Sequence, residues 1–115
     1  MSLYEAAMVL PDGVREIDVA TLSAHVGKVR VVDVREPGEY TSELGHVTGA
    51  ELVPLNTVGQ QAAGWDKAQE IVLVCRSGGR SGQAARWMKK NGFGKVINLR
   101  GGMIAWNDAR LPIER

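Results

Sequence analysis

Two uninterrupted runs of apolar, mostly β-branched residues constrain the fold of this chain most strongly. The first is Val29-Arg30-Val31-Val32-Asp33-Val34, and the second is Ile71-Val72-Leu73-Val74. A strand with one face in water alternates polar and apolar residues, whereas a nearly continuous apolar run is typical of a strand buried on both faces of a parallel sheet. Each run is followed by a stretch with helical features, so the sequence predicts an α/β fold with a mostly parallel central sheet and helices on both faces.

Capping and turn residues predict the other elements. Asp18 fits the N-cap of a helix, Pro37 the first turn of a short helix, and Gly92 the end of a longer one. We expect strands at 14–17, 51–53 and 95–99, a turn at 45–50, and helices at 18–25, from 37, at 55–64, at 81–91 and from 102. Trp87, Met88, Met103, Ile104 and Trp106 have the helical spacing of core residues.

Length and motif content exclude several classes of protein. A chain of 115 residues with 44% hydrophobic residues is long enough for one core and too short for two, so we expect a single domain over 1–115. Cys75 is the one cysteine, which rules out an intramolecular disulfide, a CxxC pair and a multi-cysteine zinc site. The sequence has no phosphate-binding glycine motif and no HExxH, so we expect no nucleotide, metal or other cofactor. It also has no signal-peptide pattern and no apolar segment of about 20 residues, so we expect a cytoplasmic protein that does not bind membranes.

The charge is distributed unevenly along the chain. The formal net charge is +1, which gives no general affinity for nucleic acid. Residues 1–75 hold 5 basic and 11 acidic side chains, a net −6, whereas residues 76–115 hold 9 and 2, a net +7. The two halves of an α/β fold interleave, so the charges could form ordinary ion pairs; alternatively, a positive field surrounds Cys75 and favours an anionic ligand.

The chemistry of the chain is concentrated where the second apolar strand ends. Cys75-Arg76-Ser77-Gly78-Gly79-Arg80-Ser81 leads directly from that strand into a helix. Glycines let a backbone turn tightly with its N–H groups facing inward, and the start of a helix stabilises negative charge. Two arginines add to this effect, so we expect the pKa of the thiol to be lowered. The alternative role of an unpaired cysteine is that of a small buried core residue, and these neighbours favour a nucleophilic Cys75 thiolate instead.

Four linked motifs resemble those of single-domain rhodaneses. They are Asp33-Val34-Arg35-Glu36-Pro37-Gly38-Glu39-Tyr40, Gly45-His46-Val47-Thr48-Gly49-Ala50, the loop from Cys75 to Ser81, and Gly101-Gly102-Met103-Ile104-Ala105-Trp106 with Leu111-Pro112. They occur in the family's order, and the resemblance covers about residues 14–113. It implies the three-layer rhodanese fold.

The resemblance also implies sulfurtransferase chemistry. Cys75 would attack the outer sulfur of thiosulfate or another sulfane donor, become a persulfide, and pass the sulfur to cyanide or a thiol. The substrate-binding residues implied by family position are Arg76, Ser77, Gly78, Gly79, Arg80 and Ser81. Arg76 is the first choice for contact with an anionic donor, and a protein could present or collect the sulfur.

Other functions and roles remain open at this point. A related group of dual-specificity phosphatases looks similar but carries five residues between cysteine and arginine, whereas this chain has four. The alternatives are a non-enzymatic interaction module and, with lower weight, a phosphatase or arsenate reductase. We expect Asp33 to brace loop amides, Arg35 to pair with Glu39 or Glu36, and His46 to be structural. Gly101 and Gly102 should allow a close approach beside the cysteine loop.

Overall fold

The computed structural model describes residues 2–115, and it contains a six-stranded sheet with strand order β1-β2-β7-β6-β3-β5. All neighbouring strands run parallel except β1 and β2, which are antiparallel. The elements in chain order are α1 (Leu3–Ala6), β1 (Met8–Val9), β2 (Arg15–Ile17), α2 (Val19–Ser23), β3 (Arg30–Asp33), α3 (Pro37–Tyr40), β4 (His46–Val47), β5 (Glu51–Leu52), η1 (Leu55–Thr57), α4 (Val58–Gln61), η2 (Ala62–Gly64), β6 (Ile71–Val74), α5 (Gly79–Lys90), β7 (Val96–Leu99), α6 (Gly102–Asp108) and β8 (Ile113–Glu114). The predicted α/β class with a mostly parallel sheet is therefore confirmed.

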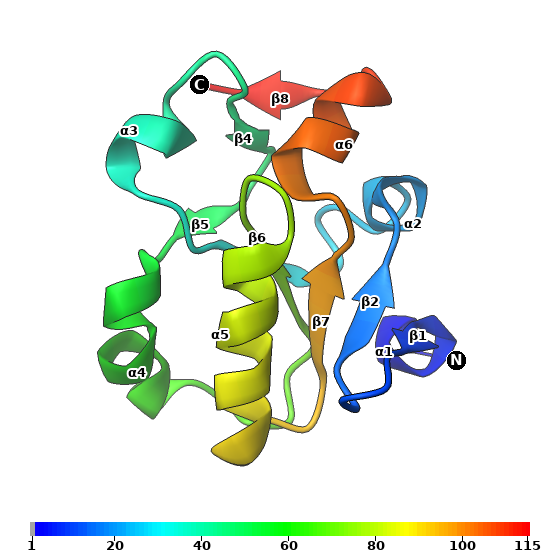
Figure 1. Cartoon of the computed structure of the whole chain (residues 1–115), viewed down its shortest axis with the longest axis vertical. Coiled ribbons are helices and arrows are strands. Elements are labelled where there is room, and N and C mark those ends of the chain that lie inside the picture. The colour runs from blue at the N-terminus through cyan, green and yellow to red at the C-terminus, as the bar shows by residue number, and fades with distance from the viewer. Residues whose placement is uncertain (1) are drawn as a thin grey trace.

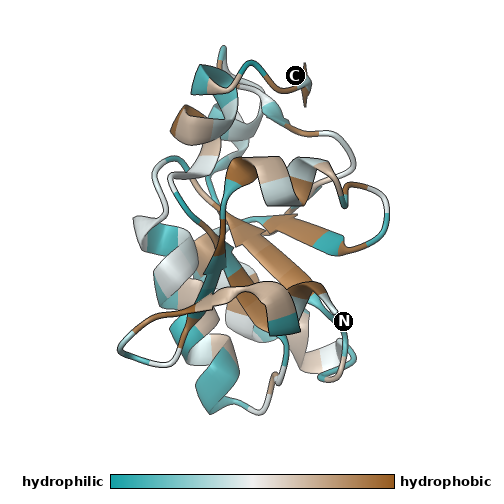
Figure 2. Cartoon of the chain, turned by 90° about the vertical axis from the view of Figure 1, so that its right-hand side faces the viewer, coloured by the Kyte–Doolittle hydropathy of each residue, from teal (hydrophilic) through white to brown (hydrophobic). Residues whose placement is uncertain are grey.

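The central strand β6 is buried on both faces, as its apolar run predicts. Ile71 and Leu73 pack with α4 and α5 on one face, and Val72 and Val74 pack with α1, α2 and α6 on the other. All four residues are fully buried. Figure 1 shows α5 lying along the sheet with α4 beside it, and Figure 2 shows the hydrophobic strands enclosed by more polar helices. The two faces of this four-residue strand thus pack in two separate hydrophobic clusters.

Local signals place the helices where capping chemistry allows them. The Asp18 carboxylate accepts from the N–H of Thr21 at 2.8 Å and caps α2. Pro37 begins α3, and α5 begins at Gly79, two residues before the expected Ser81. The predicted helix at 55–64 is divided into η1, α4 and η2. No helix within residues 2–115 is long and apolar enough to cross a bilayer.

The sequence predictions miss the elements that depend on distant partners. His46–Val47 is not only part of a turn, because it forms strand β4 and pairs antiparallel with Ile113–Glu114 of β8. The helix α1 and the edge strand β1 were also not expected. Two-residue strands have no periodicity to detect, so their pairing is decided by the fold.

The position of Trp87 also differs from the prediction. The expectation that it packs in the core is wrong, because Trp87 is 42% exposed, whereas Met88, Met103 and Trp106 are buried as predicted. Trp87 lies on the flank of α5 that faces α4, where a Cβ added to Gly59 would lie 3.5 Å from the indole ring. The indole therefore lies at the surface, between two helices.

Candidate active site

Cys75 directly follows the central strand β6, and the loop behind it wraps around its sulfur. Cys75 is 1% exposed, so the sulfur lies at the base of this loop. The N–H of Gly78 donates to Sγ at 3.1 Å, and the Ser81 hydroxyl lies 3.3 Å from Sγ. These contacts bring together the expected residues Cys75, Gly78 and Ser81.

Glycine is required at one position of this loop. Gly78 has a φ of +105°, in the left-handed region, and forms the N-cap of α5. This conformation turns its N–H toward the sulfur. Gly79 is the first residue of α5, so the expected pair of turning glycines is reduced to Gly78 alone.

The N-terminus of α6 holds the other side of the loop. The N–H groups of Met103 and Ile104 donate to the carbonyl oxygens of Cys75 and Arg76 at 2.9 and 3.0 Å. Gly102 allows this approach, because an added Cβ would overlap both carbonyl oxygens. The loop carbonyls are thereby engaged by α6, away from the sulfur.

The environment of the sulfur favours its ionised form. Burial raises the pKa of Cys75, but the hydrogen bonds from the Ser81 hydroxyl and from the N–H groups of Ser81, Gly78 and Ser77 outweigh burial. The net effect is a thiol pKa below its ordinary value. A lowered pKa makes a thiolate, and hence a nucleophile, available closer to neutral pH.

The two loop arginines differ in their partners. Arg80 makes a two-point ion pair with Glu39 of α3, at 2.7 and 2.8 Å. The hydrogen bonds from Arg80 lower the pKa of Glu39 to about 2. Arg76 is exposed, and within residues 2–115 its side chain makes no ion pair. Arg76 is therefore the loop cation whose charge is not neutralised by a protein carboxylate.

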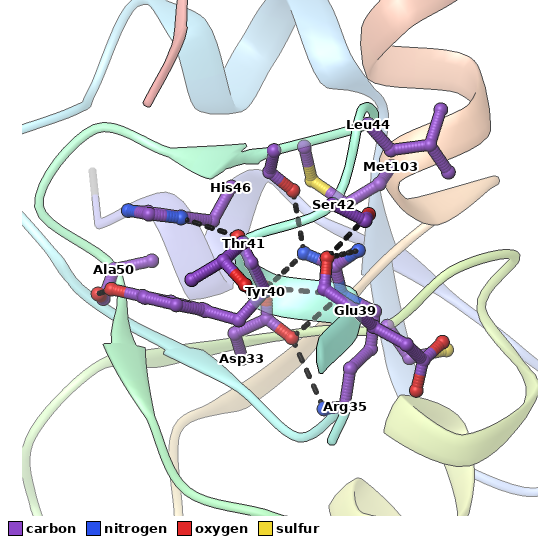
Figure 3. Close-up of polar contacts among 12 residues, drawn as sticks. Asp33, Arg35, Glu39, Tyr40, Thr41, Ser42, Leu44, His46, Ala50 and Met103 are labelled. Carbon is purple, nitrogen blue, oxygen red and sulfur yellow. Dashed lines mark hydrogen bonds and ion pairs between the residues drawn. The ribbon is translucent and has the colours of Figure 1, made fainter. Parts of the chain in front are cut away.

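A buried ion pair supports α3, which carries Glu39. Asp33 and Arg35 pair at 2.8 Å with both side chains almost fully buried, so the expected pairing of Arg35 with Glu39 or Glu36 is wrong. Arg35 also donates to the Glu39 carbonyl oxygen at 3.2 Å (Figure 3) and to the Gly45 carbonyl oxygen at 2.7 Å. Asp33 accepts from the N–H of Arg35 and thus does brace a loop amide, as predicted.

His46 lies beside this cluster and contacts Tyr40. Its ring stacks on Tyr40 with the ring centroids 3.6 Å apart, and Nδ1 is 2.8 Å from the Tyr40 carbonyl oxygen (Figure 3). The residue is 7% exposed. These contacts give His46 the structural position expected from the sequence.

The charge asymmetry along the chain is reduced in part by ion pairs between the two halves. Arg80, Arg86 and Arg100, which follow Cys75, pair with Glu39, Asp12 and Glu16, which precede it. The positive charge near the sulfur is accordingly smaller than the net +7 suggests, because these pairs neutralise three of the arginines. Within the described part of the chain, no group of three His, Cys, Asp or Glu side chains is placed to hold a metal ion.

Sequence reasoning missed two residues that contact the loop through hydrogen bonds. Asn98 of β7 accepts from the Ser81 hydroxyl at 2.5 Å and donates to the Gly78 carbonyl oxygen at 3.2 Å. Glu39 holds Arg80. A polar residue in the run Val96-Ile97-Asn98-Leu99 was the one available signal for Asn98, since a buried strand position seldom carries an amide without a partner.

A groove of about 670 Å³ lies beside the loop, between α5 and the segment formed by η1 and α4. One face of α5 lines it with Arg80, Gln83, Ala84 and Trp87, which follow helical spacing. Val34 and Ala84 belong both to the groove lining and to the apolar cluster around Cys75. The groove is therefore adjacent to the hydrophobic cluster that contains Cys75.

Comparison with known proteins identifies the family. Residues 18–109 match the rhodanese-like domain family. This chain belongs to the rhodanese-like family. A sulfurtransferase from Allochromatium vinosum is 39% identical over 103 residues, which cover 87% of this chain and 94% of that protein.

Solved structures of similar proteins agree with the observed fold. A rhodanese-like domain protein from Staphylococcus aureus superposes with a TM-score of 0.73 at 29% identity, covering 87% of this chain and 98% of that one. A Rhodopseudomonas palustris protein of unknown function, described as a possible tyrosine phosphatase, gives a TM-score of 0.80 at 25% identity, covering 88% and 85%. Three other relatives are longer, and this rhodanese-like chain spans 41 to 61% of their lengths.

Proposed function

We propose that this rhodanese-like protein is a sulfurtransferase that carries a sulfane sulfur as a persulfide on Cys75. The observation that carries the proposal is the sulfur held in a loop of hydrogen-bond donors, with the Gly78 N–H at 3.1 Å and the Ser81 hydroxyl at 3.3 Å. These donors stabilise negative charge on the sulfur before the donor arrives, as covalent catalysis requires. The family membership supports the same chemistry.

The first step forms the persulfide. The Cys75 thiolate attacks the outer sulfur of thiosulfate, a new bond forms between Sγ and that sulfur, and the original sulfur–sulfur bond breaks. Sulfite leaves with the bonding electron pair, so one negative charge stays on the outer sulfur of the persulfide. Arg76, exposed at the loop, attracts the dianionic donor.

The second step returns the enzyme to its starting state. An acceptor thiolate or cyanide attacks the outer sulfur, and the Cys75 sulfur leaves as a thiolate with the electron pair. The product is a persulfide of the acceptor or thiocyanate. No proton has to move in either step when both nucleophiles are ionised, so the mechanism needs no general base and assigns none to His46.

The groove beside the loop is large enough for the organic part of a donor bigger than thiosulfate. Thiosulfate has only five heavy atoms, far too few to fill a groove of about 670 Å³. The walls contributed by Leu55, Val58 and Trp87 are apolar, and the Arg80 charge at this groove is already paired with Glu39. We therefore assign to the groove the apolar substituent of an organic sulfane donor, whose sulfur end meets Cys75.

The decisive experiment is the intact mass of the reduced protein after incubation with thiosulfate. We expect a gain of one sulfur, about 32 Da, that cyanide or dithiothreitol removes and that Cys75→Ser lacks. An adduct formed only with a low-molecular-weight persulfide would retain the carrier role and change the donor. No adduct with either donor, in a protein shown to be folded by circular dichroism, would favour the non-enzymatic interaction module.

The same samples test the phosphatase alternative. We expect no Cys75-dependent hydrolysis of an aryl phosphate, because the Arg80 guanidinium is already engaged by Glu39 and the loop has one residue fewer than the phosphatase loop. Hydrolysis that Cys75→Ser abolishes would overturn this expectation.

A further inference from the structure

The Ser81 hydroxyl lies between two acceptors. Its oxygen is 3.3 Å from the Cys75 sulfur and 2.5 Å from Oδ1 of Asn98. Ser81 is fully buried in the first turn of α5, and Asn98 is 4% exposed on β7. A hydroxyl has one proton to donate, so Ser81 cannot satisfy both acceptors at once.

The neighbours of Asn98 determine which way its amide points. Nδ2 lies 3.2 Å from the Gly78 carbonyl oxygen and 3.2 Å from Oε2 of Glu16. Both partners are acceptors only, so the amide nitrogen has to face them and the amide oxygen has to face Ser81. The competition for the Ser81 proton is therefore imposed by the surroundings of Asn98.

We propose that Asn98 controls the charge on Cys75 by competing with the sulfur for the single proton of Ser81. While Cys75 is a thiol, Ser81 donates to Asn98 and its oxygen is free to accept from the thiol. When Cys75 ionises, the hydroxyl rotates to the thiolate, and the buried Asn98 oxygen loses its donor. Ionisation thus costs one hydrogen bond, which makes the thiolate less stable and more nucleophilic than Ser81 alone would make it.

The competition also distinguishes the thiolate from the persulfide. In the persulfide the negative charge is on the outer sulfur, so Sγ is a weaker hydrogen-bond acceptor. The Ser81 hydroxyl therefore rotates back and donates to Asn98 again. The bond lost on ionisation is regained when sulfur is taken up. This inference deepens the proposed function, and its meaning for sulfur transfer rests on that function.

The charged groups on and around the cysteine loop could also affect the ionisation of Cys75. Arg76 lies in the loop itself. The other groups form pairs on the surrounding elements, which are Arg80 with Glu39, Arg35 with Asp33, and Arg100 with Glu16. The α6 side contributes the N–H groups of Met103 and Ile104 to the loop carbonyls. Replacement of Asn98 by an apolar residue changes only Glu16 among the charged groups, by removing one of its donors.

The test is the pH profile of Cys75 alkylation by iodoacetamide in Asn98→Leu, which keeps the side-chain shape and removes the amide. We expect the midpoint to move to lower pH, so that alkylation at pH 6.5 becomes several times faster. We also expect the rate well above the midpoint to fall, because a more stable thiolate is a weaker nucleophile. Ser81→Ala should move the midpoint the opposite way.

The double variant separates competition from loop support. In the Ser81→Ala background, Asn98→Leu should leave the midpoint unchanged, because the contested proton is gone. A rise of the midpoint in Asn98→Leu, or the same shift in both backgrounds, would mean that Asn98 only anchors Gly78, and would overturn the proposal.

A measurement on the unaltered protein covers the case in which Asn98→Leu does not fold. The side-chain carbonyl carbon of Asn98 should show an NMR shift that titrates with the alkylation midpoint of Cys75 and that is absent in Ser81→Ala. An Asn98 carbonyl insensitive to Cys75 ionisation would refute the competition. Neither measurement uses a sulfur donor, so failure of this inference is distinguishable from failure to form a persulfide.

Discussion

The Arg80 guanidinium faces the Glu39 carboxylate in a parallel two-point ion pair, with nitrogen–oxygen distances of 2.7 and 2.8 Å. The pair joins the start of α5 to α3, which the buried Asp33–Arg35 pair and the Arg35 bond to the Glu39 carbonyl oxygen hold in place. One arginine of the cysteine loop is thereby fixed to the scaffold, and the other, Arg76, remains exposed.

Glu39 should contribute to stability in a pH-dependent way. Its pKa falls from 4.5 to about 2 on folding, so the pair stabilises the protein fully above about pH 4.5 and loses this contribution as the pH falls toward 2. The side chains are about one-third exposed, so we expect Glu39→Gln to lower the free energy of unfolding at pH 7 by about 1 kcal/mol or less. Urea unfolding at pH 7 and at pH 2.5 measures the difference, which should shrink at the lower pH. Glu43→Gln, at an exposed site, is the matched control, and an equal effect of Glu39→Gln at both pH values would contradict the assignment.

Arg76 should matter more than Arg80 for an anionic donor. We expect Arg76→Gln to lower kcat/KM for thiosulfate roughly tenfold, equivalent to about 1.4 kcal/mol, because no carboxylate within residues 2–115 pairs with its guanidinium. Arg80→Gln should have a smaller effect on that ratio, since Glu39 already engages the charge. Steady-state kinetics at two salt concentrations make the comparison, with Arg86→Gln as the control, since Arg86 pairs with Asp12. A larger loss in Arg80→Gln than in Arg76→Gln would reverse the assigned roles.

Gly102 should be needed for both stability and sulfur transfer. In Gly102→Ala the new Cβ would overlap the carbonyl oxygens of Cys75 and Arg76, and the φ of +54° is unfavourable for alanine. We expect the free energy of unfolding to fall by about 1 to 3 kcal/mol and persulfide formation to become slower. Thermal unfolding and the mass assay measure the two effects. Gly94→Ala adds a methyl group that meets no atom within 4 Å, so it should be mild, and equal losses in the two variants would contradict the explanation.

Trp87 should determine which organic donors the protein prefers. Methanethiosulfonate and benzenethiosulfonate present the same reactive sulfur with a small or an aromatic substituent, and we expect the aromatic donor to react more efficiently. Trp87→Ala should lower kcat/KM for benzenethiosulfonate by about 3- to 10-fold, the value of one aromatic contact, and leave thiosulfate unchanged. Val9→Ala, at another exposed apolar position, is the control. An unchanged donor preference in Trp87→Ala would remove the groove from the substrate site.

Short-range patterns explain why so much of the fold can be predicted. The runs at 29–34 and 71–74, the Asp18 cap and Pro37 act within a few residues, so β3, β6, α2 and α3 lie close to their expected positions. The same holds for the loop, because a strand, a cysteine, a left-handed glycine and a helix start are consecutive in the chain. Trp87 was placed wrongly because its surroundings come from another element, α4. Arg35 was paired wrongly because Glu39 is engaged by the distant Arg80, and Arg35 instead pairs with Asp33, two residues away.

The sequence by itself determined the α/β class and the position of Cys75 after a central strand, since these follow from local patterns of burial and turning. It also carried the four linked motifs on which the rhodanese resemblance rests. Only the tertiary structure decided which arginine pairs with a carboxylate, which residue accepts from the Ser81 hydroxyl, and how α6 contacts the loop. Glu39 is 41 residues from Arg80, and Asn98 is 17 from Ser81. Electrostatic and hydrogen-bonding partners depend on distance in space, which the sheet order fixes and the order of residues along the chain does not.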